Sequence, residues 1–293
     1  MAEKDAYQAS KNYHEDVPPI KQTFHVKGMH HADWGLKDRL SRIFSPRSGR
    51  TVMLAFDHGY IMGSTTGLER LDLVIPELAP HADVFMATRG AIRTCVPPTF
   101  GKAIALRATA GSSILQDDVT DEVLAVDIED AIRMNASCVA VQTFIGSKDE
   151  KSSIDSLNKA INAGNRYGIA TLGVVAVGKQ MERTARFFLL ATRMLAEFGV
   201  HLVKTYYCED FGKIVAACPV PIVIAGGKKL PEDEALTLAY RAVSDGAAGV
   251  DMGRNIFQAG DPAAMTQAIA KVVHENYTDK DAFGFYNDIR QKR

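Results

Sequence analysis

Hydrophobic residues gather in eight short runs that are spaced along most of the chain. These runs cover residues 51–56, 83–88, 103–109, 138–144, 170–177, 201–207, 221–226 and 248–253. Each run is almost continuously apolar, as expected of parallel strands that are covered on both faces. Between the runs, apolar residues recur at helical spacing, for example over 153–168, 182–199 and 231–246. The alternation predicts an α/β fold with a single closed (β/α)8 barrel, or TIM barrel; a doubly wound open sheet is the lesser alternative.

The segment before the first run, residues 1–50, is predicted to be an extension of the barrel. Residues 1–25 are polar, and we expect them to be poorly ordered. A helix is predicted over 32–44, because five apolar residues fall near one face of it: Trp34, Leu36, Leu40, Ile43 and Phe44. We expect this helix to cap the bottom of the barrel or to contact a neighbouring subunit.

The barrel itself is expected over residues 51–276, with 277–293 as a C-terminal tail. Its least regular part is 111–122, which follows the third strand. This stretch is rich in serine and aspartate and shows no clear periodicity, so it is predicted to be a long loop over the top of the barrel.

Composition and charge exclude several classes of protein. The 293 residues are 46% hydrophobic and 24% charged, which is typical of a globular protein with a large core. The net charge is −1, so no global basic field favours nucleic acid. The apolar runs are strand-sized and the N-terminus is polar, so we expect neither a transmembrane helix nor a secretory signal. Four cysteines without metal-binding spacing indicate reduced thiols in a cytoplasmic protein.

Residues that could carry chemistry follow from the rule that such barrels form their active sites at the carboxyl ends of the strands. The rule selects the following side chains and glycines: Asp57, His58, Gly59, Arg107, Gln142, Lys179, Lys204, Tyr206, Tyr207, Gly226, Gly227, Lys228, Gly253 and Arg254. Side chains alternate across a strand, so only one of Tyr206 and Tyr207 can face the site.

Lys204 is a lone cation inside the apolar run 201–207. Burial disfavours the ammonium form of a lysine, and the neutral amine is a nucleophile that forms imines with ketones. An imine withdraws electrons, so that a neighbouring C–C bond can break to give an enamine. The alternative is structural: Lys204 pairs with Asp57 or Glu209 in a polar layer of the barrel.

The seventh and eighth runs each end in glycine beside a cation, at Gly226–Gly227 and at Gly253–Arg254. In barrels these two strand ends often bind phosphate, because glycines let backbone N–H groups approach its oxygens. Arg254, and Lys228 or Lys229, can add charge-assisted hydrogen bonds. The alternative is that the glycines only form tight turns and that the cations are solvated.

Asp57 and His58 follow the first run and could face the same cavity. Asp57 could hold substrate hydroxyl groups, and His58 could carry a proton. A capping aspartate and a packed histidine are equally good interpretations. No metal site is expected, because the adjacent His30 and His31 lie in the extension and no set of His and carboxylate ligands has suitable spacing.

Together these residues resemble the deoxyribose-phosphate-type and archaeal-type class I fructose-bisphosphate aldolase family. The matching pieces are AFDHGY (55–60), VKTYY (203–207), IAGGKK (224–229) and VDMGRNIFQ (250–258), within a similarity that spans roughly 45–275. The resemblance implies a Schiff-base lysine at Lys204 and the family's aspartate at Asp57. It also implies a phosphate site whose glycines and arginine are Gly226, Gly227, Gly253 and Arg254.

One departure from the archaeal-type aldolases changes the expected reaction. Those enzymes carry a catalytic tyrosine near the end of the fifth strand, and the corresponding stretch 172–180 has none. Aldol cleavage must remove a hydroxyl proton, whereas thiolytic cleavage needs only a thiolate that attacks a ketone. The chain is also similar, over nearly its full length, to family members that cleave a phosphorylated dione by thiolysis.

The resemblance therefore implies an acyltransferase that takes a phosphorylated dione and coenzyme A, without a tightly bound cofactor. It also implies a homo-oligomer, because relatives form rings that are often decamers. Coenzyme A is implied by the resemblance alone, since no nucleotide-binding motif is evident. Two alternatives remain: a class I sugar-phosphate aldolase that needs no coenzyme A, and a non-catalytic protein that binds sugar phosphates.

Overall fold

Eight parallel strands close into a barrel in the computed structural model, which describes residues 15–18, 23–177 and 183–292. The barrel order is β1-β10-β9-β8-β7-β6-β3-β2. Its strands are β1 (Thr51–Ala55), β2 (Val84–Thr88), β3 (Ala103–Arg107), β6 (Cys138–Thr143), β7 (Ala170–Val175), β8 (Leu202–Tyr206), β9 (Ile222–Ala225) and β10 (Gly249–Met252). The (β/α)8 barrel is confirmed, and the doubly wound alternative is excluded because β1 pairs with both β2 and β10.

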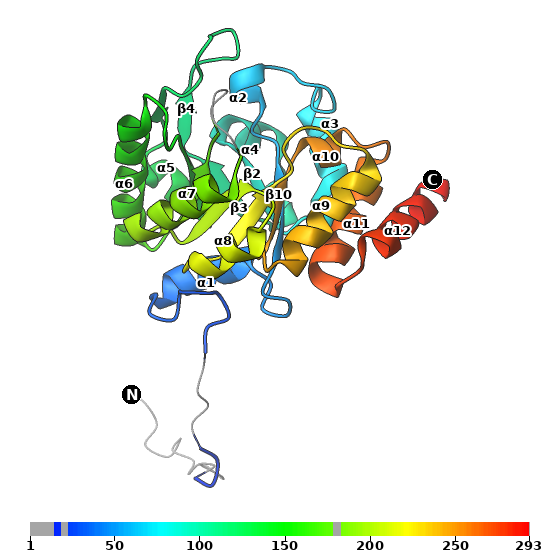
Figure 1. Cartoon of the computed structure of the whole chain (residues 1–293), viewed down its shortest axis with the longest axis horizontal. Coiled ribbons are helices and arrows are strands. Elements are labelled where there is room, and N and C mark those ends of the chain that lie inside the picture. Colours follow the sequence, from blue (N-terminus) through cyan, green and yellow to red (C-terminus); the bar gives the residue numbers. More distant parts are fainter. Residues whose placement is uncertain (1–14, 19–22, 178–182, 293) are drawn as a thin grey trace, which may run out of the picture.

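Helices surround the strands on the outside of the barrel (Figure 1). They are α3 (Leu71–Leu78), α4 (Arg89–Cys95), α5 (Ile128–Arg133), α6 (Glu150–Tyr167), α7 (Ala185–Phe198), α8 (Phe211–Ala217), α9 (Glu232–Ser244) and α11 (Pro262–Glu275). Two short helices, α2 (Gly59–Met62) and α10 (Arg254–Phe257), follow β1 and β10 directly. Short 3₁₀ turns lie at Ala79–His81 and Pro98–Phe100. Among the described residues, no helix is both long and apolar enough to cross a membrane.

Helix α1 (Trp34–Ile43) lies at the base of the barrel and packs against β3 and β7 (Figure 1). Asp33 caps its first turn by accepting a hydrogen bond from the Leu36 N–H at 2.8 Å. Leu40 and Ile43 are fully buried. Trp34 is 80% exposed, so the prediction that it shares the apolar face was wrong. The expectation that residues 1–25 are poorly ordered falls mostly outside the described residues.

Two elements differ in detail from the predicted pattern. The stretch 111–122, predicted to be a loop, is bounded by the antiparallel strands β4 (Thr109–Gly111) and β5 (Glu122–Leu124), which protrude at the top of the barrel. The stretch 277–293, expected as a tail, contains helix α12 (Asp279–Gln291), which packs against α9 and α11. Tyr286 of α12 is 1% exposed, so this helix belongs to the packed body of the protein.

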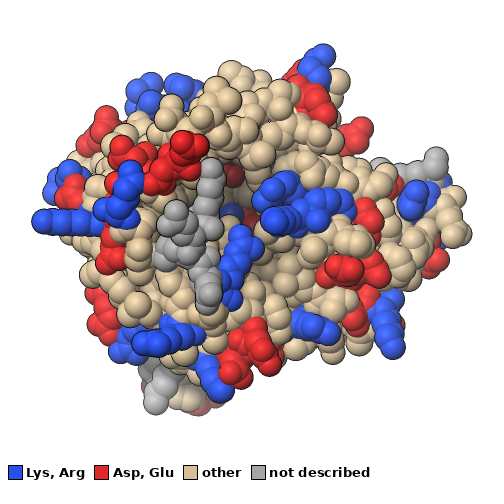
Figure 2. All heavy atoms as spheres, turned by 45° about the horizontal axis from the view of Figure 1, so that its top comes forward, with Lys and Arg blue, Asp and Glu red and all other residues tan. Residues whose placement is uncertain are grey.

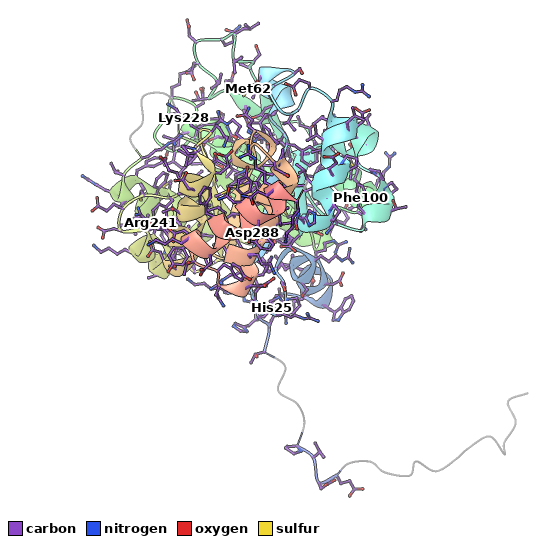
Figure 3. The ribbon with its side chains drawn as sticks, turned by 90° about the vertical axis from the view of Figure 1, so that its right-hand side faces the viewer. His25, Met62, Phe100, Lys228, Arg241 and Asp288 are labelled. Carbon is purple, nitrogen blue, oxygen red and sulfur yellow. The ribbon has the colours of Figure 1, made fainter. Side chains whose placement is uncertain are left out.

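Side views separate the two ends of the barrel. Met62 at the end of α2 and Lys228 after β9 lie at the top, whereas His25 lies at the base (Figure 3). The top is therefore the end at which the strands finish, and the residues that follow them surround a common space.

Candidate active site

A cavity of about 280 Å³ opens at the carboxyl ends of the strands. It is seen from above as a hollow with Lys and Arg side chains at its rim (Figure 2). Gly59, Lys228 and Lys229 are not part of its lining. The lining brings together the seven residues to which the family resemblance and the strand-end positions point most strongly: Asp57, His58, Lys204, Gly226, Gly227, Gly253 and Arg254. Arg107, Gln142 and Tyr206 also line it, whereas Lys179 lies outside the described residues.

Lys204 points inward from β8 and is 9% exposed. Its Nζ lies 2.9 Å from Oδ2 of Asp251 and 3.4 Å from Sδ of Met86. The prediction that a structural partner would be Asp57 or Glu209 was wrong, because Asp251 on β10 occupies that position. The Lys204 side chain thus has one carboxylate beside it and a cavity in front of it, through which a small ligand can reach the amine.

Asp251 was missed by the sequence reasoning, although it stands between Val250 and Met252 in an apolar run. Its side chain is completely buried. Burial raises the pKa of Asp251, and the positive charge of Lys204 only partly opposes this effect. The signal that could have found it is the one that singled out Lys204, a charged residue within a barrel strand.

Asp57 and His58 follow β1 and face the cavity beside Lys204. Burial would raise the pKa of Asp57, but nearby positive charge, above all that of Arg107 and then that of Lys204, outweighs it and holds this pKa below its usual range. Burial lowers the pKa of His58 despite the nearby charge of Asp57. The pair thus favours an ionised aspartate and a neutral imidazole near neutral pH.

The ring of His58 is held by packing more than by hydrogen bonds. It meets the ring of Phe257 edge to face, with centroids 5.3 Å apart. Its Nδ1 lies 3.9 Å from Oδ1 of Asp57, and no group in the described residues forms a hydrogen bond with it. This nitrogen is buried, and the carboxylate of Asp57 lies near it without forming a hydrogen bond.

Arg107 of β3 is the centre of a buried polar network that fixes Asp57. Its guanidinium donates to Oδ2 of Asp57 at 3.2 Å and to Oε2 of Glu122 at 2.8 Å. It also lies 4.5 Å from the ring centroid of Tyr60, whose hydroxyl donates to Oε1 of Glu122 at 2.7 Å. Tyr60 and Glu122 were not predicted, because their roles depend on β5 folding back over the barrel.

The end of β9 is held in place by a side chain from α10. Asn255 is fully buried; its Nδ2 donates to the Gly226 carbonyl and its Oδ1 accepts from the Leu230 N–H, both at 2.8 Å. Gly227 has φ +69°, a conformation that glycine adopts without strain. A Cβ on Gly226 would lie 2.9 Å from Nδ2 of Asn255, so the turn needs both glycines.

The end of β10 is equally crowded on one side and open on the other. A Cβ on Gly253 would lie 2.5 Å from both the Ala55 carbonyl oxygen and Cε1 of His58. In the described part of the chain, the backbone N–H groups of Gly227, Gly253 and Arg254 form no hydrogen bond in the turns and loops beyond the strand ladder. Donors of this kind at two neighbouring strand ends suit the oxygens of an anion.

Arg254 supplies the positive charge next to these donors. Its Nε is buried and, among the described residues, has no hydrogen-bond partner and no ion pair. Lys229 is instead held by Glu232 at 3.0 Å, and Lys228 is exposed, so the structure favours Arg254 over either lysine. An unpaired guanidinium at a cavity wall is a strong site for phosphate.

Tyr206 lines the cavity, whereas the Tyr207 hydroxyl donates to Oδ2 of Asp245 away from it, at 2.9 Å. The prediction that only one of the two tyrosines can face the site is confirmed. The guanidinium of Arg183 stacks on Tyr206 at 3.9 Å from the ring centroid. The stretch 172–180, which contains no tyrosine, contributes Val174 of β7 to the cavity.

Comparison with known proteins agrees with this geometry. Residues 51–259 match the DeoC/LacD family aldolase profile. The chain is 52% identical to the 3-hydroxy-5-phosphonooxypentane-2,4-dione thiolase of Enterobacter sp. (strain 638) and 51% identical to that of Klebsiella pneumoniae, each over 99% of both chains. The crystal structure of an archaeal fructose 1,6-bisphosphate aldolase superimposes with a TM-score of 0.73 at 25% identity, covering 82% of this chain and 99% of that one.

The likeness to the thiolases extends over the barrel and the N-terminal extension alike, since they align over 292 residues. The archaeal enzyme supports the same barrel at a greater sequence distance. The chain therefore belongs to the DeoC/LacD aldolase family and, within it, to the group of the 3-hydroxy-5-phosphonooxypentane-2,4-dione thiolases.

Proposed function

We propose that this protein is an acyltransferase that cleaves 3-hydroxy-5-phosphonooxypentane-2,4-dione with coenzyme A. The products are dihydroxyacetone phosphate and acetyl-CoA, and the reaction degrades the phosphorylated form of the quorum-sensing signal autoinducer-2. The observation that carries the proposal is the position of Lys204 in one cavity with the open strand ends at Gly226–Gly227 and Gly253–Arg254. About 50% identity to thiolases of that name supports the choice of substrate.

The phosphate of the substrate binds at the ends of β9 and β10, which follow β8 around the barrel. Backbone N–H groups of Gly226, Gly227 and Gly253 and the guanidinium of Arg254 provide its hydrogen bonds. This anchor places the ketone next to the phosphate-bearing carbon in front of the Lys204 amine. The rest of the dione then extends toward Asp57, His58 and Arg107.

Lys204 forms an imine with this ketone, and the imine serves as the electron sink. The coenzyme A thiolate adds to the distal acetyl ketone and pushes its π electrons onto oxygen. Collapse of that adduct re-forms the carbonyl as a thioester and breaks the central C–C bond. The bonding pair becomes the enamine of dihydroxyacetone phosphate on Lys204. Protonation of the enamine carbon and hydrolysis of the imine release the second product.

His58 is the better candidate for the base that removes the thiol proton, with Asp57 as its anionic neighbour. Its lowered pKa favours the neutral imidazole at neutral pH, and its ring lines the cavity. Asp57 is held ionised by Arg107 and stabilises an imidazolium when His58 takes up the proton.

The imine is tested by reduction with borohydride in the presence of substrate or dihydroxyacetone phosphate, followed by peptide mass spectrometry. The adduct is expected on Lys204 and on no other lysine. Lys204→Met should bind phosphate but show neither adduct nor turnover. Absence of an adduct on wild-type Lys204 would sink the imine mechanism.

Two further expectations rest on the same resemblance. We place the enzyme in the cytoplasm, where its cysteines, all four of them free thiols, stay reduced. We also propose a homo-oligomer, a decamer by likeness to relatives. Light scattering coupled to size-exclusion chromatography would measure its mass directly.

A further inference from the structure

The Lys204 amine lies beside a buried carboxylate at the wall of the cavity. Nζ of Lys204 is 2.9 Å from Oδ2 of Asp251, whose side chain is fully buried, whereas the Lys204 side chain is 11% exposed. Both residues line the cavity, and the side chain of Asp251 is the more deeply buried of the two. A substrate in the cavity can therefore reach the amine, and Asp251 is the carboxylate in direct contact with that amine. No group of the described residues other than Lys204 approaches its carboxylate oxygens closely enough to neutralise them.

The pair does not have the properties of a stabilising element. A buried ion pair gives little net stability over well-packed apolar side chains of similar volume, because both charges lose their hydration. The neighbours of Asp251 on β10, Val250 and Met252, are fully buried and apolar. A chemical role toward the amine is therefore a simpler explanation for a carboxylate at this position than a contribution to stability.

The other charged and titratable groups around the pair leave this role to Asp251. Asp57 and His58 approach from the segment after β1, Arg107 from β3 and Arg254 from α10, and Cys138 lies on β6. Arg107 is occupied by Asp57 and Glu122. Burial, with a contribution from the charge of Asp251, raises the pKa of the Cys138 thiol, so this group stays neutral.

The basicity of Asp251 also fits an exchange of protons with an amine. An ordinary carboxylate is too weak a base to take a proton from an ammonium group at neutral pH. Burial raises the pKa of Asp251, which makes this carboxylate a stronger base than an exposed one. A base is most effective when its affinity for the proton is near that of the donor.

We propose that Asp251 is the base that takes the proton from Lys204 and so prepares the amine for imine formation; this rests on the proposed imine. The proton moves from Nζ to Oδ2, which frees the nitrogen lone pair. That pair forms the C–N bond, and the π electrons of the ketone move to its oxygen. This oxygen leaves as water with two protons, one from the attached nitrogen and one returned by Asp251. An iminium cation then faces a carboxylate anion.

Asp251→Asn tests this role, because the amide keeps the shape of the carboxylate but cannot take the proton. The probe is dihydroxyacetone phosphate with cyanoborohydride, and the readout is the rate at which the reduced adduct forms on Lys204 from about pH 6 to about pH 9. At neutral pH the variant should form the adduct about 100-fold more slowly or worse. Its rate should then rise about tenfold per pH unit, since hydroxide replaces the missing base.

Controls separate this role from a structural one. Asp245→Asn makes the same chemical change beside Tyr207, outside the cavity, and should leave the rate and its pH profile unchanged. Stabilisation of Asp251→Asn by inorganic phosphate against heat should match wild type, which shows that the anion site is intact. Equal rates in Asp251→Asn and wild type at neutral pH, or an equal loss at every pH, would overturn the proposal.

The pH dependence of adduct formation in the wild-type protein tests the role of Asp251 even if Asp251→Asn does not fold. Internal proton transfer predicts a trapping rate that stays within about twofold between about pH 6 and about pH 8.5. A tenfold rise per pH unit in wild type would identify solvent as the base and would contradict the proposal. If wild type forms no adduct on Lys204 at any pH, the proposed function itself fails.

Discussion

Replacing Arg107 by methionine should both destabilise the protein and disturb its site. Methionine has a similar length but leaves Asp57 and Glu122 as buried carboxylates without their cation, which lies 3.2 and 2.8 Å from them. Removing one partner of a buried ion pair costs about 3–5 kcal/mol. For a domain of this size, such a loss lowers the melting temperature by about 6–20 °C.

The assay should follow unfolding by far-ultraviolet circular dichroism, since the single tryptophan, Trp34, is 80% exposed and reports poorly on the core. Arg42→Met is the matched control, because Arg42 forms a surface pair with Asp38 that is worth about 1 kcal/mol or less. Adding Glu122→Gln to Arg107→Met should recover part of the lost free energy of unfolding, because the unpaired carboxylate is removed as well. The coupling energy between the two substitutions should be about 1–3 kcal/mol.

The reasoning would be refuted if Arg107→Met melted within about 2 °C of wild type, or if Glu122→Gln made the variant still less stable. Arg107→Met should also raise the pKa of Asp57, because it removes the guanidinium, which is the principal positive charge that lowers this pKa. Loss of turnover at neutral pH with the Lys204 adduct retained would place the defect in the thiolytic half of the reaction.

Two further predictions concern the anion site and a buried histidine. Arg254→Gln should raise the KM for the phosphorylated dione about 10- to 100-fold with a smaller change in kcat, since one charge-assisted contact is lost. Lys228→Gln, at an exposed residue, is the control. An equal effect of both substitutions on KM would argue against an anion site at Arg254. Burial, followed by the charge of His31, lowers the pKa of His201 to about 4. The unfolded chain protonates this residue below about pH 6.5, so its contribution to stability, about 3 kcal/mol in full, is present above that pH and is lost as the pH falls toward 4. Between about pH 7 and about pH 5, the free energy of unfolding measured in urea should therefore fall by about 2 kcal/mol less in His201→Asn than in wild type. An equal fall in both proteins would contradict this prediction.

The sequence was sufficient for the barrel because each strand is a local apolar run with helical patterns on either side. It also pointed to Lys204 and to the glycine pairs, since strand ends in such a barrel converge. The partnership of Lys204 with Asp251 depends on barrel closure and register, which bring β8 and β10 to either side of β9. Inspection of charged residues within strands could have suggested it.

The Arg107 network was beyond sequence reasoning for a different reason. Glu122 stands at the end of an acidic stretch that has the composition of a surface loop. Only the pairing of β5 with β4 turns its side chain inward, where it is 1% exposed. Trp34 shows the converse case, because helical periodicity placed it on an apolar face although the packed surface begins at Leu36.

The central claim is that Lys204 makes an aldolase-type enamine while the other fragment leaves as a thioester. Incubating the protein with 3-hydroxy-5-phosphonooxypentane-2,4-dione, with and without coenzyme A, tests it most directly. The account predicts acetyl-CoA and dihydroxyacetone phosphate in equal amounts, only when coenzyme A is present and only with Lys204 intact. Cleavage without coenzyme A, or turnover of fructose 1,6-bisphosphate in place of the dione, would contradict it.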